Sequence, residues 1–382
     1  MSTGSWAPTG PLPTALQWQG SAEGGVLLAD GRVLVVGGGD ARYLAMADCL
    51  LFDPTTVSWA SATPLPEGRS LHSTTVLDNG TVLVAGGSTG PQRYPALPLE
   101  TAVQLSPDTG IWSPAGTLVK PRVGHSATRL PDGRVLVAGG WGARNPQTGE
   151  TFAAAEIYNP ADNTWTATGD MVDTRSGHQA LLLTNGKVLV IGGTTDIGRG
   201  QYAGLAFCEL FDPATGTWTP TGSLANPRWN NTATVLPDGS VLVTGGGGFQ
   251  AMFADWVVAP HGDWTAERYD PATGRWARDS DLSAPRVWHQ AVALKSGKLL
   301  VTGGGAPPML NAGFHSTAVY DPNARAWSPA SGMGTGRWAH LAVGLADGRV
   351  LVAGGSDQPA AGGVGYHLTT SSEIFTPAGA GR

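Results

Sequence analysis

The chain has 382 residues, and 23 lysines and arginines against 29 aspartates and glutamates give it a formal net charge of -6 at pH 7. It contains no run of basic residues, which disfavours a nucleic-acid partner. Its apolar runs are too short to span a membrane, and residues 1–6 lack the basic and apolar segments of a signal peptide. These features predict a cytoplasmic protein that binds neither nucleic acid nor membrane.

One short unit recurs along the chain: an apolar strand, a tight turn, a second apolar strand and a pair of glycines. Its seven copies are marked by glycine pairs that begin at Gly37, Gly86, Gly139, Gly192, Gly245, Gly303 and Gly354, at intervals of 49 to 58 residues. A period near fifty predicts a β-propeller, because each unit buries its hydrophobic faces only by stacking on its neighbours.

The second unit shows the four strands of one blade in chain order. Strand a covers 72–77, the turn Asp78-Asn79-Gly80 has the composition of a hairpin that needs positive φ, and strand b covers 81–85. After a loop, strand c covers 101–105 and strand d surrounds Trp112. Aligned on the glycine pairs, the strand-d tryptophans are Trp59, Trp112, Trp165, Trp218, Trp276 and Trp327.

The two ends of the chain are expected to share the last blade. No strand-d tryptophan follows the seventh glycine pair, but Trp6 precedes Trp59 by 53 residues, which is one period. Residues 3–9 are therefore predicted to pair with the C-terminal blade at 336–377 and to close the ring. Residues 1–382 then form one domain.

Two cysteines, Cys49 and Cys208, occupy the same place in units 1 and 4. Equal places in separate blades lie far apart on a ring, so both are predicted to be buried free thiols. No disulfide framework then requires an oxidising compartment.

The ends of the strand-c segments resemble the kelch repeat family, as in Glu156-Ile157-Tyr158-Asn159-Pro160 and Glu267-Arg268-Tyr269-Asp270-Pro271. The glycine pairs and the one tryptophan per unit resemble that family over nearly the whole chain. The resemblance implies an all-β, seven-bladed kelch-type β-propeller. Kelch propellers include scaffold proteins, sugar-acid epimerases and the propeller domain of galactose oxidase, so the fold does not assign a function.

The loops divide between the two faces of such a ring. Because the strands are antiparallel, the short a–b and c–d turns share one face, and the long, varied b–c and d–a loops share the other. Ligands are predicted to bind at the b–c/d–a loop face. Its longest loop, 247–265, contains the apolar residues Phe253 and Trp256. This loop either walls a pocket for a small molecule or packs over the tops of the blades.

Most units begin strand a with the pattern Arg-x-x-His. The histidine position reads Glu23, His72, His125, His178, Asn231, His289 and His340, and the arginine position reads Gly20, Arg69, Arg122, Arg175, Arg228, Arg286 and Arg337. A ring of histidines admits a metal ion, yet the pattern also suits hydrogen bonds between blades and to backbone carbonyls. No residue is assigned as a metal ligand. The substrate-binding candidates from this ring are Arg69, Arg228, Asn231, Arg286, His289 and Arg337.

Units 1, 5, 6 and 7 depart from the pattern. Glu23 would place a carboxylate near the mouth of the channel, where it acts as a general base, anchors a ligand or neutralises a neighbouring arginine. Tryptophans also stand beside the ring in these units alone. Trp18, Trp229, Trp288 and Trp338 would form an arc that either lines an aromatic pocket or fills gaps between blades.

Three further histidines, His261, His315 and His367, lie in the b–c loops of units 5, 6 and 7. Two of them share the contexts Gly313-Phe314-His315 and Gly365-Tyr366-His367, which adds Phe314 and Tyr366 to the substrate-binding candidates. The histidines would act as acid and base groups in one shared site, or are unrelated surface residues.

The segment Arg286-Val287-Trp288-His289 resembles the copper-binding strand of galactose oxidase, in which a Tyr-His pair occupies the last two places. Trp288 stands where that family has its ligand tyrosine, and no other unit has a tyrosine at this place. A copper-radical oxidase is therefore disfavoured.

Together these residues favour an enzyme of isomerase, cyclase or lyase type that acts on a largely apolar or aromatic small molecule without an organic cofactor. Its predicted catalytic residues are Glu23, His261, His315 and His367, and the arginines and aromatic residues named above would bind the substrate. One alternative is a non-catalytic module that binds a protein or peptide through the same surface. A second is an iron or copper oxygenase with histidine ligands.

Overall fold

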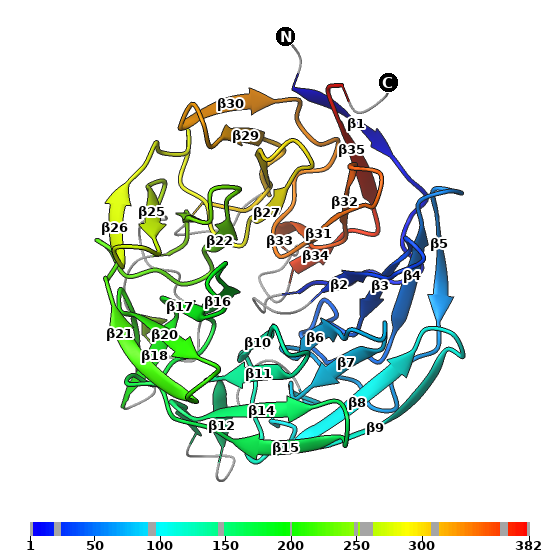
Figure 1. Cartoon of the computed structure of the whole chain (residues 1–382). Helices are drawn as coiled ribbons and strands as arrows, with labels where there is room; N and C mark the ends of the chain where they lie inside the picture. The colour runs from blue at the N-terminus through cyan, green and yellow to red at the C-terminus, as the bar shows by residue number, and fades with distance from the viewer. Residues whose placement is uncertain are drawn as a thin grey trace.

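A computed structural model describes residues 3–18, 24–90, 97–143, 149–198, 201–247, 251–252, 263–306, 313–359 and 366–379. Seven four-stranded antiparallel sheets stand around a central axis (Figure 1). The described part of the chain contains strands, turns and loops and no helix, so it holds no helix that could cross a membrane. The predicted all-β, seven-bladed propeller is confirmed.

The first four blades follow the chain. Blade 1 consists of β2 (Gly25–Leu27), β3 (Val33–Val36), β4 (Cys49–Asp53) and β5 (Ser58–Ala62). Blade 2 consists of β6 (Ser73–Val76), β7 (Val82–Ala85), β8 (Thr101–Ser106) and β9 (Ile111–Thr117). Blade 3 consists of β10 (Ser126–Arg129), β11 (Val135–Ala138), β14 (Ala155–Asn159) and β15 (Thr164–Ala167). Blade 4 consists of β16 (Gln179–Leu182), β17 (Val188–Ile191), β20 (Cys208–Asp212) and β21 (Thr217–Thr221).

The last three blades complete the ring. Blade 5 consists of β22 (Thr232–Val235), β23 (Val241–Thr244), β25 (Ala266–Asp270) and β26 (Arg275–Arg278). Blade 6 consists of β27 (Gln290–Ala293), β28 (Leu299–Thr302), β29 (Thr317–Asp321) and β30 (Ala326–Ala330). Blade 7 consists of β31 (Leu341–Gly344), β32 (Val350–Ala353), β35 (Ser372–Pro377) and β1 (Gly4–Pro8). The N-terminal strand thus supplies the outer strand of the last blade, with Trp6 opposite Phe375.

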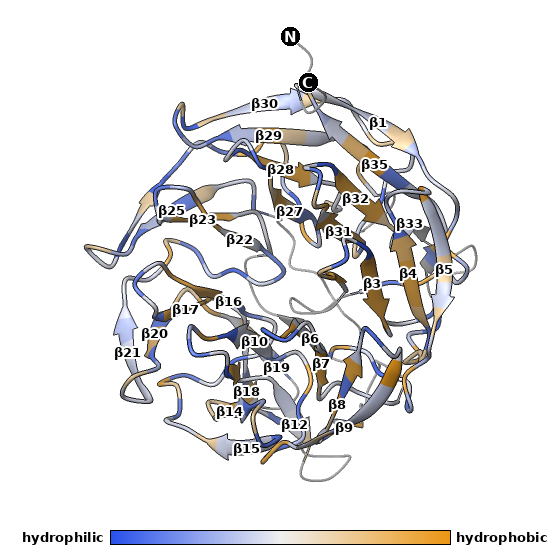
Figure 2. Cartoon of the chain, turned by 45° about the vertical axis from the view of Figure 1, so that its right-hand side comes forward, coloured by the Kyte–Doolittle hydropathy of each residue, from blue (hydrophilic) through white to orange (hydrophobic). Residues whose placement is uncertain are grey.

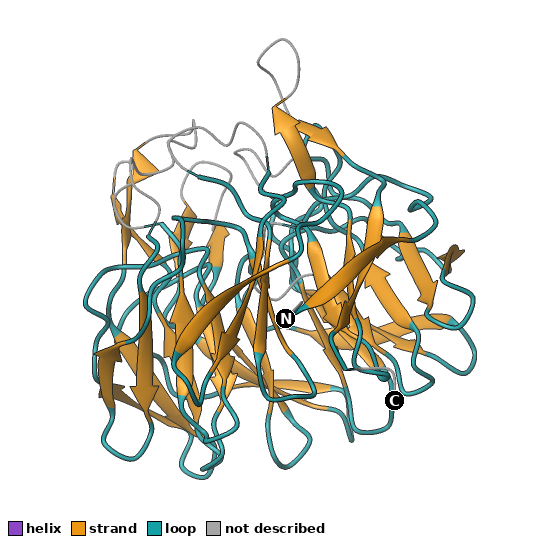
Figure 3. Cartoon of the chain, turned by 90° about the horizontal axis from the view of Figure 1, so that it is seen from above, coloured by secondary structure: helices purple, strands orange, loops and turns teal. Residues whose placement is uncertain are grey.

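Additional strands extend from the b–c loops of some blades. They are β12 (Trp141–Ala143) with β13 (Gly149–Thr151), β18 (Thr194–Gly198) with β19 (Gln201–Gly204) and β24 (Ala251–Met252), and β33 (Ser356–Pro359) with β34 (Tyr366–Leu368). Figure 3 shows the ring from its side, with the blades standing next to one another.

Strand b of every blade is an apolar run because both of its faces are covered. β7 and β11 both read Val-Leu-Val-Ala and are buried at all four positions, between strands a and c of their own blade and between the two adjacent blades. The hydropathy view shows the hydrophobic inner strands, such as β3 and β32, enclosed by more polar outer strands (Figure 2). Stacking of blades therefore supplies the hydrophobic core.

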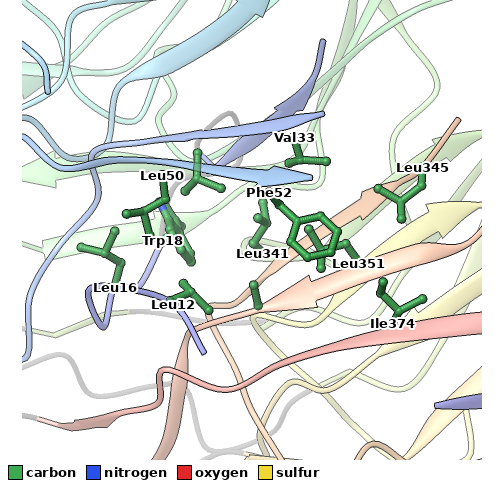
Figure 4. Close-up of a cluster of buried hydrophobic side chains, with 12 residues drawn as sticks. Leu12, Leu16, Trp18, Val33, Leu50, Phe52, Leu341, Leu345, Leu351 and Ile374 are labelled. Carbon is green, nitrogen blue, oxygen red and sulfur yellow. The ribbon is translucent and has the colours of Figure 1, made fainter. Parts of the chain in front are cut away.

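The core between blades 7 and 1 shows this stacking in detail (Figure 4). Leu341 and Leu351 of blade 7 pack in one cluster with Val33, Leu50 and Phe52 of blade 1. Leu12, Leu16 and Trp18, from the segment that connects β1 to blade 1, complete this cluster. The connecting segment is therefore part of the core at the closure of the ring.

The outer tryptophans fasten each blade to the preceding one. Trp165 packs against Tyr158 of its own blade with 5.0 Å between ring centroids, and its indole N–H donates to Ala115 O of blade 2 at 2.8 Å. Trp6 packs in the same way against Phe375 and donates to Ser331 O of blade 6. Each tryptophan thus combines an apolar contact within a blade with a hydrogen bond between blades.

Both cysteines are buried free thiols, as predicted. Burial raises the pKa of Cys49 and of Cys208 to about 12, so both remain protonated and unreactive at neutral pH.

Candidate functional site

Buried arginines organise the loop face of the ring. Arg69, Arg122, Arg175, Arg228, Arg286 and Arg337 each stand in a d–a loop, and each is at most 1% exposed. Arg175 shows the shared geometry, because its Nη1 donates to Gly192 O at the end of strand b and to Phe207 O before strand c, both at 2.9 Å. The sequence candidates Arg69, Arg228, Arg286 and Arg337 make the same pair of backbone contacts.

A buried glutamate on strand c completes this arrangement in blades 3, 4, 5 and 7. Glu209 accepts hydrogen bonds from the backbone N–H groups of Val172 and Asp173, at 2.6 and 3.2 Å, and from Arg175 Nη2 at 2.8 Å. The equivalent carboxylates are Glu156, Glu267 and Glu373. Two loop N–H groups and a guanidinium therefore form a cradle that holds a carboxylate; in blade 5 one loop N–H takes part.

Blades 2 and 6 keep the arginine but lack the glutamate. Strand pairing places Val103 in blade 2 and Ala318 in blade 6 at the glutamate position. Nη2 of Arg69 donates instead to Thr101 Oγ1, and Nη2 of Arg286 to Ser316 Oγ. Burial without a neighbouring carboxylate lowers the pKa of Arg286 to about 10.

Blade 1 replaces the whole ion pair with an apolar pair. The amide of Gly355 donates to Leu16 O at 2.9 Å, as the amide of Gly304 donates to Arg337 O at 2.8 Å, so Leu16 occupies the arginine position. Strand pairing places Leu50 at the glutamate position. Leu16 and Leu50 pack in the same core cluster.

The arginine position predicted for blade 1 at Gly20 is therefore wrong. Gln17 forms an isolated β-bridge with Gly39, as Ser70 does with Ser88 in blade 2. Gln17 is therefore equivalent to Ser70 when blade 1 is aligned with blade 2. Seven positions separate Gln17 from Gly24, whereas three separate Ser70 from its equivalent Ser73, so blade 1 carries four additional residues. Gly20 and Glu23 both lie outside the described residues.

The ring histidines connect neighbouring blades. His125 Nε2 lies 2.9 Å from Ser73 Oγ of the preceding blade, and His178 Nε2 lies 2.8 Å from Ser126 Oγ. The candidate His289 is 2% exposed and lies 3.0 Å from Thr232 Oγ1. Burial lowers the pKa of His125 and of His289 to about 3, which keeps both rings neutral at neutral pH.

The described residues contain no group of three or more histidine, cysteine, aspartate or glutamate side chains placed to hold a metal ion. The contacts of His125, His178, His289 and His340 match the alternative that the sequence left open, hydrogen bonding between blades.

Trp18 and Asn231 take the place of the ring histidine in blades 1 and 5. The indole of Trp18 lies against Gly354 of blade 7, as the ring of His340 lies against Gly303 of blade 6. Asn231 is 2% exposed, and its backbone carbonyl accepts a hydrogen bond from Gln179 Nε2 of the preceding blade at 2.9 Å. Both residues therefore contribute to contacts between blades.

The other three tryptophans of the predicted arc do lie together. Ring centroids of Trp229 and Trp288 are 5.8 Å apart in an edge-to-face arrangement, and those of Trp288 and Trp338 are 5.4 Å apart. Trp338 is fully buried and Trp229 is 8% exposed. Three of the four tryptophans of the predicted arc therefore lie together, Trp18 packs in the core between blades 7 and 1, and Trp229 and Trp338 are covered by protein.

The loop residues of blades 6 and 7 occupy different places. Phe314 N donates to Gly304 O as Thr369 N donates to Gly355 O, so Phe314 corresponds to Thr369 and not to Tyr366. Phe314 packs under the Arg286 guanidinium, 5.4 Å from ring centroid to Cζ. The similar contexts of the two histidines therefore do not reflect equivalent positions.

Both of these histidines have a defined partner. His315 is exposed, and its Nδ1 lies 3.0 Å from Met333 O. His367 is 62% exposed, and its Nδ1 lies 2.6 Å from a carboxylate oxygen of Asp357, which is 18% exposed. The candidates Phe253, Trp256 and His261, and the side chain of Tyr366, lie outside the described residues.

Comparison with known proteins agrees with this geometry. Residues 124–355 match the KLHDC2/KLHL20/DRC7 Kelch-repeats domain. The chain belongs to the kelch-repeat family. The resemblance that the glycine pairs and tryptophans indicated is thus confirmed.

Several kelch-repeat relatives are longer proteins. Alpha-scruin of Limulus polyphemus is 27% identical over 258 residues, which cover 66% of this chain and 27% of alpha-scruin. Spermatocyte protein spe-26 of Caenorhabditis elegans is 29% identical over 61% of this chain and 39% of its own. Kelch-like protein terF of Aspergillus terreus is 24% identical over 65% of this chain and 53% of its own. The matched region thus spans about a quarter to a half of these relatives.

A solved structure of the same architecture is described as a novel fungal alcohol oxidase with catalytic diversity among the AA5 family, in complex with copper. It superposes with a TM-score of 0.76 over 98% of this chain and 76% of its own, at 18% sequence identity. At this identity the likeness extends to the fold alone.

Removing the carboxylate of Glu209 is expected to destabilise the protein. Glu209→Leu leaves the fully buried Arg175 without its counter-charge, which costs about 3–5 kcal/mol of unfolding free energy. The double variant Arg175→Leu/Glu209→Leu imitates Leu16 and Leu50 of blade 1 and is expected to lose less than the single variant. Urea unfolding measures both, and a double variant less stable than Glu209→Leu would contradict the account.

The buried histidines predict a dependence of stability on pH. The folded pKa of His125 is about 3, below its unfolded value of about 6.5, so its contribution is complete above pH 6.5 and is lost as the pH falls toward 3. His125→Asn, which copies Asn231 of blade 5, is expected to reduce the slope of unfolding free energy below pH 6.5 by about 1.4 kcal/mol per pH unit. Equal slopes for the variant and the wild type would refute this assignment.

Proposed function

We propose that this kelch propeller is a binding module that docks a protein partner on its b–c/d–a loop face. The proposal rests on the exposed apolar side chains, which gather on this face. Among the described residues, the large apolar side chains that are exposed are Leu44, Leu97, Ile111, Val119, Val172, Ile197 and Trp264. All except Ile111 belong to b–c or d–a loops.

The exposed side chains on this face are large enough to serve as anchors. Trp264, before strand c of blade 5, is 50% exposed, and Ile197 on β18 is also 50% exposed. Tryptophan, tyrosine and arginine contribute most of the binding energy at protein interfaces, which makes Trp264 the main candidate anchor. Kelch propellers commonly mediate protein interactions, which supports the same reading.

The charged groups of this face support a scaffold role. The arginine forks bind backbone carbonyls, and in four blades they also pair with a buried glutamate. The ring histidines are neutral and buried. A partner would therefore contact loop side chains above this framework.

Substitution of the anchors tests this function. Trp264→Ala and Ile197→Ser are each expected to weaken the partner's affinity about tenfold or more, because each removes an exposed apolar anchor. The partner is first captured by a photo-crosslinking residue placed at Trp264, then purified, and its Kd is measured by calorimetry.

Ile111→Ser is the matched control, since Ile111 is 63% exposed on the opposite face, where it begins β9 directly after the c–d turn of blade 2. It is expected to leave the Kd unchanged. An equal loss of affinity for Ile111→Ser and Trp264→Ala would contradict docking on the loop face.

We propose acid/base catalysis on a small apolar or aromatic molecule as the second candidate function. The supporting observation is the pair formed by His367 and Asp357, because a carboxylate that orients an imidazole is a common arrangement for a general base. In this second function, Glu23 and His261 remain predicted acid/base residues. The reaction is still predicted to use no organic cofactor. His315 bonds the Met333 carbonyl and is a weaker candidate.

Loss of the imidazole tests the second function. If the protein turns over a small molecule, His367→Asn is expected to reduce kcat at least 100-fold, because general-base catalysis contributes about that much. His315→Asn serves as the control and should retain most of the activity. Full activity of His367→Asn would remove this pair from the catalytic assignment.

A further inference from the structure

The carboxylate cradle of the kelch blades is complete in blade 6 except for the carboxylate. In blades 3, 4 and 7 a glutamate on strand c accepts two loop N–H groups and one guanidinium N–H. In blade 6 the loop and Arg286 are retained, and Ala318 stands at the glutamate position. Its side chain ends at Cβ and carries no acceptor.

The blade-6 loop has the conformation that presents these N–H groups elsewhere. Leu282 N donates to Trp264 O at 2.8 Å, as Leu118 N donates to Glu100 O at 2.8 Å in the loop that leads into blade 3. Ser283 and Ala284 form the same bend that Val119 and Lys120 form. Ser283 and Ala284 therefore correspond to the residues whose N–H groups bind Glu156.

No other group in the described part of blade 6 takes over the role of the glutamate. Among the hydrogen bonds between described residues, none uses the N–H of Ser283 or Ala284. The nearest carboxylate in the sequence, Asp281, pairs instead with Arg278 at 2.6 Å. Arg286 directs Nη2 to Ser316 Oγ at 3.1 Å, and no carboxylate of the described residues forms an ion pair with it.

The cradle is open to solvent on one side and buried on the other. Ser283 and Ser316 are exposed, and Ala284 is half-buried, whereas Arg286 is 1% exposed. Donors fixed in position beside a desolvated guanidinium favour an anion, and carboxylates match the guanidinium geometry. Exposure of Ser283 and Ser316 places this side of the loop in contact with solvent, from which a carboxylate would approach the donors.

We propose that blade 6 carries a carboxylate-binding site formed by the N–H groups of Ser283 and Ala284, the Arg286 guanidinium and the Ser316 hydroxyl. The ligand's carboxylate occupies the place that Glu156, Glu209 and Glu373 occupy in their own blades. The ligand is either a free small organic acid or an acidic side chain of a polypeptide. The site depends on contacts within blade 6 and on neither candidate function.

Blade 2 offers an internal comparison. Its arginine, Arg69, also lacks a glutamate, but Pro66 stands at the position of Ser283 and has no N–H to donate. Glu67 follows directly and adds a negative charge that interacts with Arg69. The blade-2 loop is therefore a poorer anion site than the blade-6 loop.

Acetate is the probe that tests the site in the full chain. The melting temperature is measured in sodium acetate and in sodium chloride at equal ionic strength, and the Kd is obtained from the acetate dependence. Acetate is expected to raise the wild-type Tm by about 2 °C at ten times its Kd, because it binds the folded state alone. Equal melting temperatures in the two salts would overturn the proposal.

Two variants assign the binding to blade 6. Ala318→Glu supplies the missing carboxylate from within, so it is expected to raise the Tm without acetate and to abolish the acetate response. Ser283→Pro copies Pro66 of blade 2, removes one donor, and is expected to weaken acetate binding at least fivefold. A wild-type acetate response in Ser283→Pro would overturn the proposal even if Ala318→Glu failed to fold.

A control variant and a second ligand complete the experiment. Ala326→Glu adds the same charge at an exposed position of β30 and is expected to retain the acetate response. An acetylated and amidated Gly-Glu-Gly peptide identifies the source of the carboxylate. Binding at least tenfold tighter than acetate indicates a polypeptide side chain, comparable binding indicates a free acid, and both outcomes support the site.

Discussion

The loop face depends on the hydrogen bonds of a buried arginine that six of the seven blades carry in their d–a loop. Its guanidinium joins the end of strand b to the beginning of strand c, as Arg175 joins Gly192 and Phe207 in blade 4. A buried cation is costly unless it is hydrogen-bonded and neutralised, so the blades differ mainly in how they meet this requirement. Glu209 neutralises Arg175 in blade 4, whereas blade 1 has the uncharged Leu16 at the arginine position.

The architecture could be predicted because each blade repeats the same constraints. The glycine pairs, the outer tryptophans and the strand pairing of Trp6 with the last blade all follow a period that can be counted. The site could be predicted only in part. Counting residues from the glycine pairs placed the arginine position of blade 1 at Gly20, but the four additional residues after Trp18 shift this position to Leu16. The glutamates were missed, although Glu156 and Glu209 recur on strand c, because a contact between a loop and a strand has no fixed spacing in sequence.

Burial separates the large apolar residues of the loop face into two groups. Trp338 and Trp229 lie within the ring, where their main contacts are with protein. Trp264 and Ile197 lie on the outer loops and remain half exposed. Sequence alone gives both groups the same appearance, because tryptophan suits a gap between blades as well as an interface. The exposed group supports docking of a partner, and the buried group stabilises the scaffold.

The kelch scaffold builds a carboxylate cradle in blades 3, 4, 5 and 7, and blade 6 leaves the equivalent cradle open to a ligand. A high-resolution structure from crystals grown in acetate tests whether the blade-6 cradle binds a carboxylate. Planar density is expected within about 3.2 Å of the N–H groups of Ser283 and Ala284 and of Arg286 Nη2. A protein side chain in that place, or acetate bound elsewhere with these donors unoccupied, would contradict it.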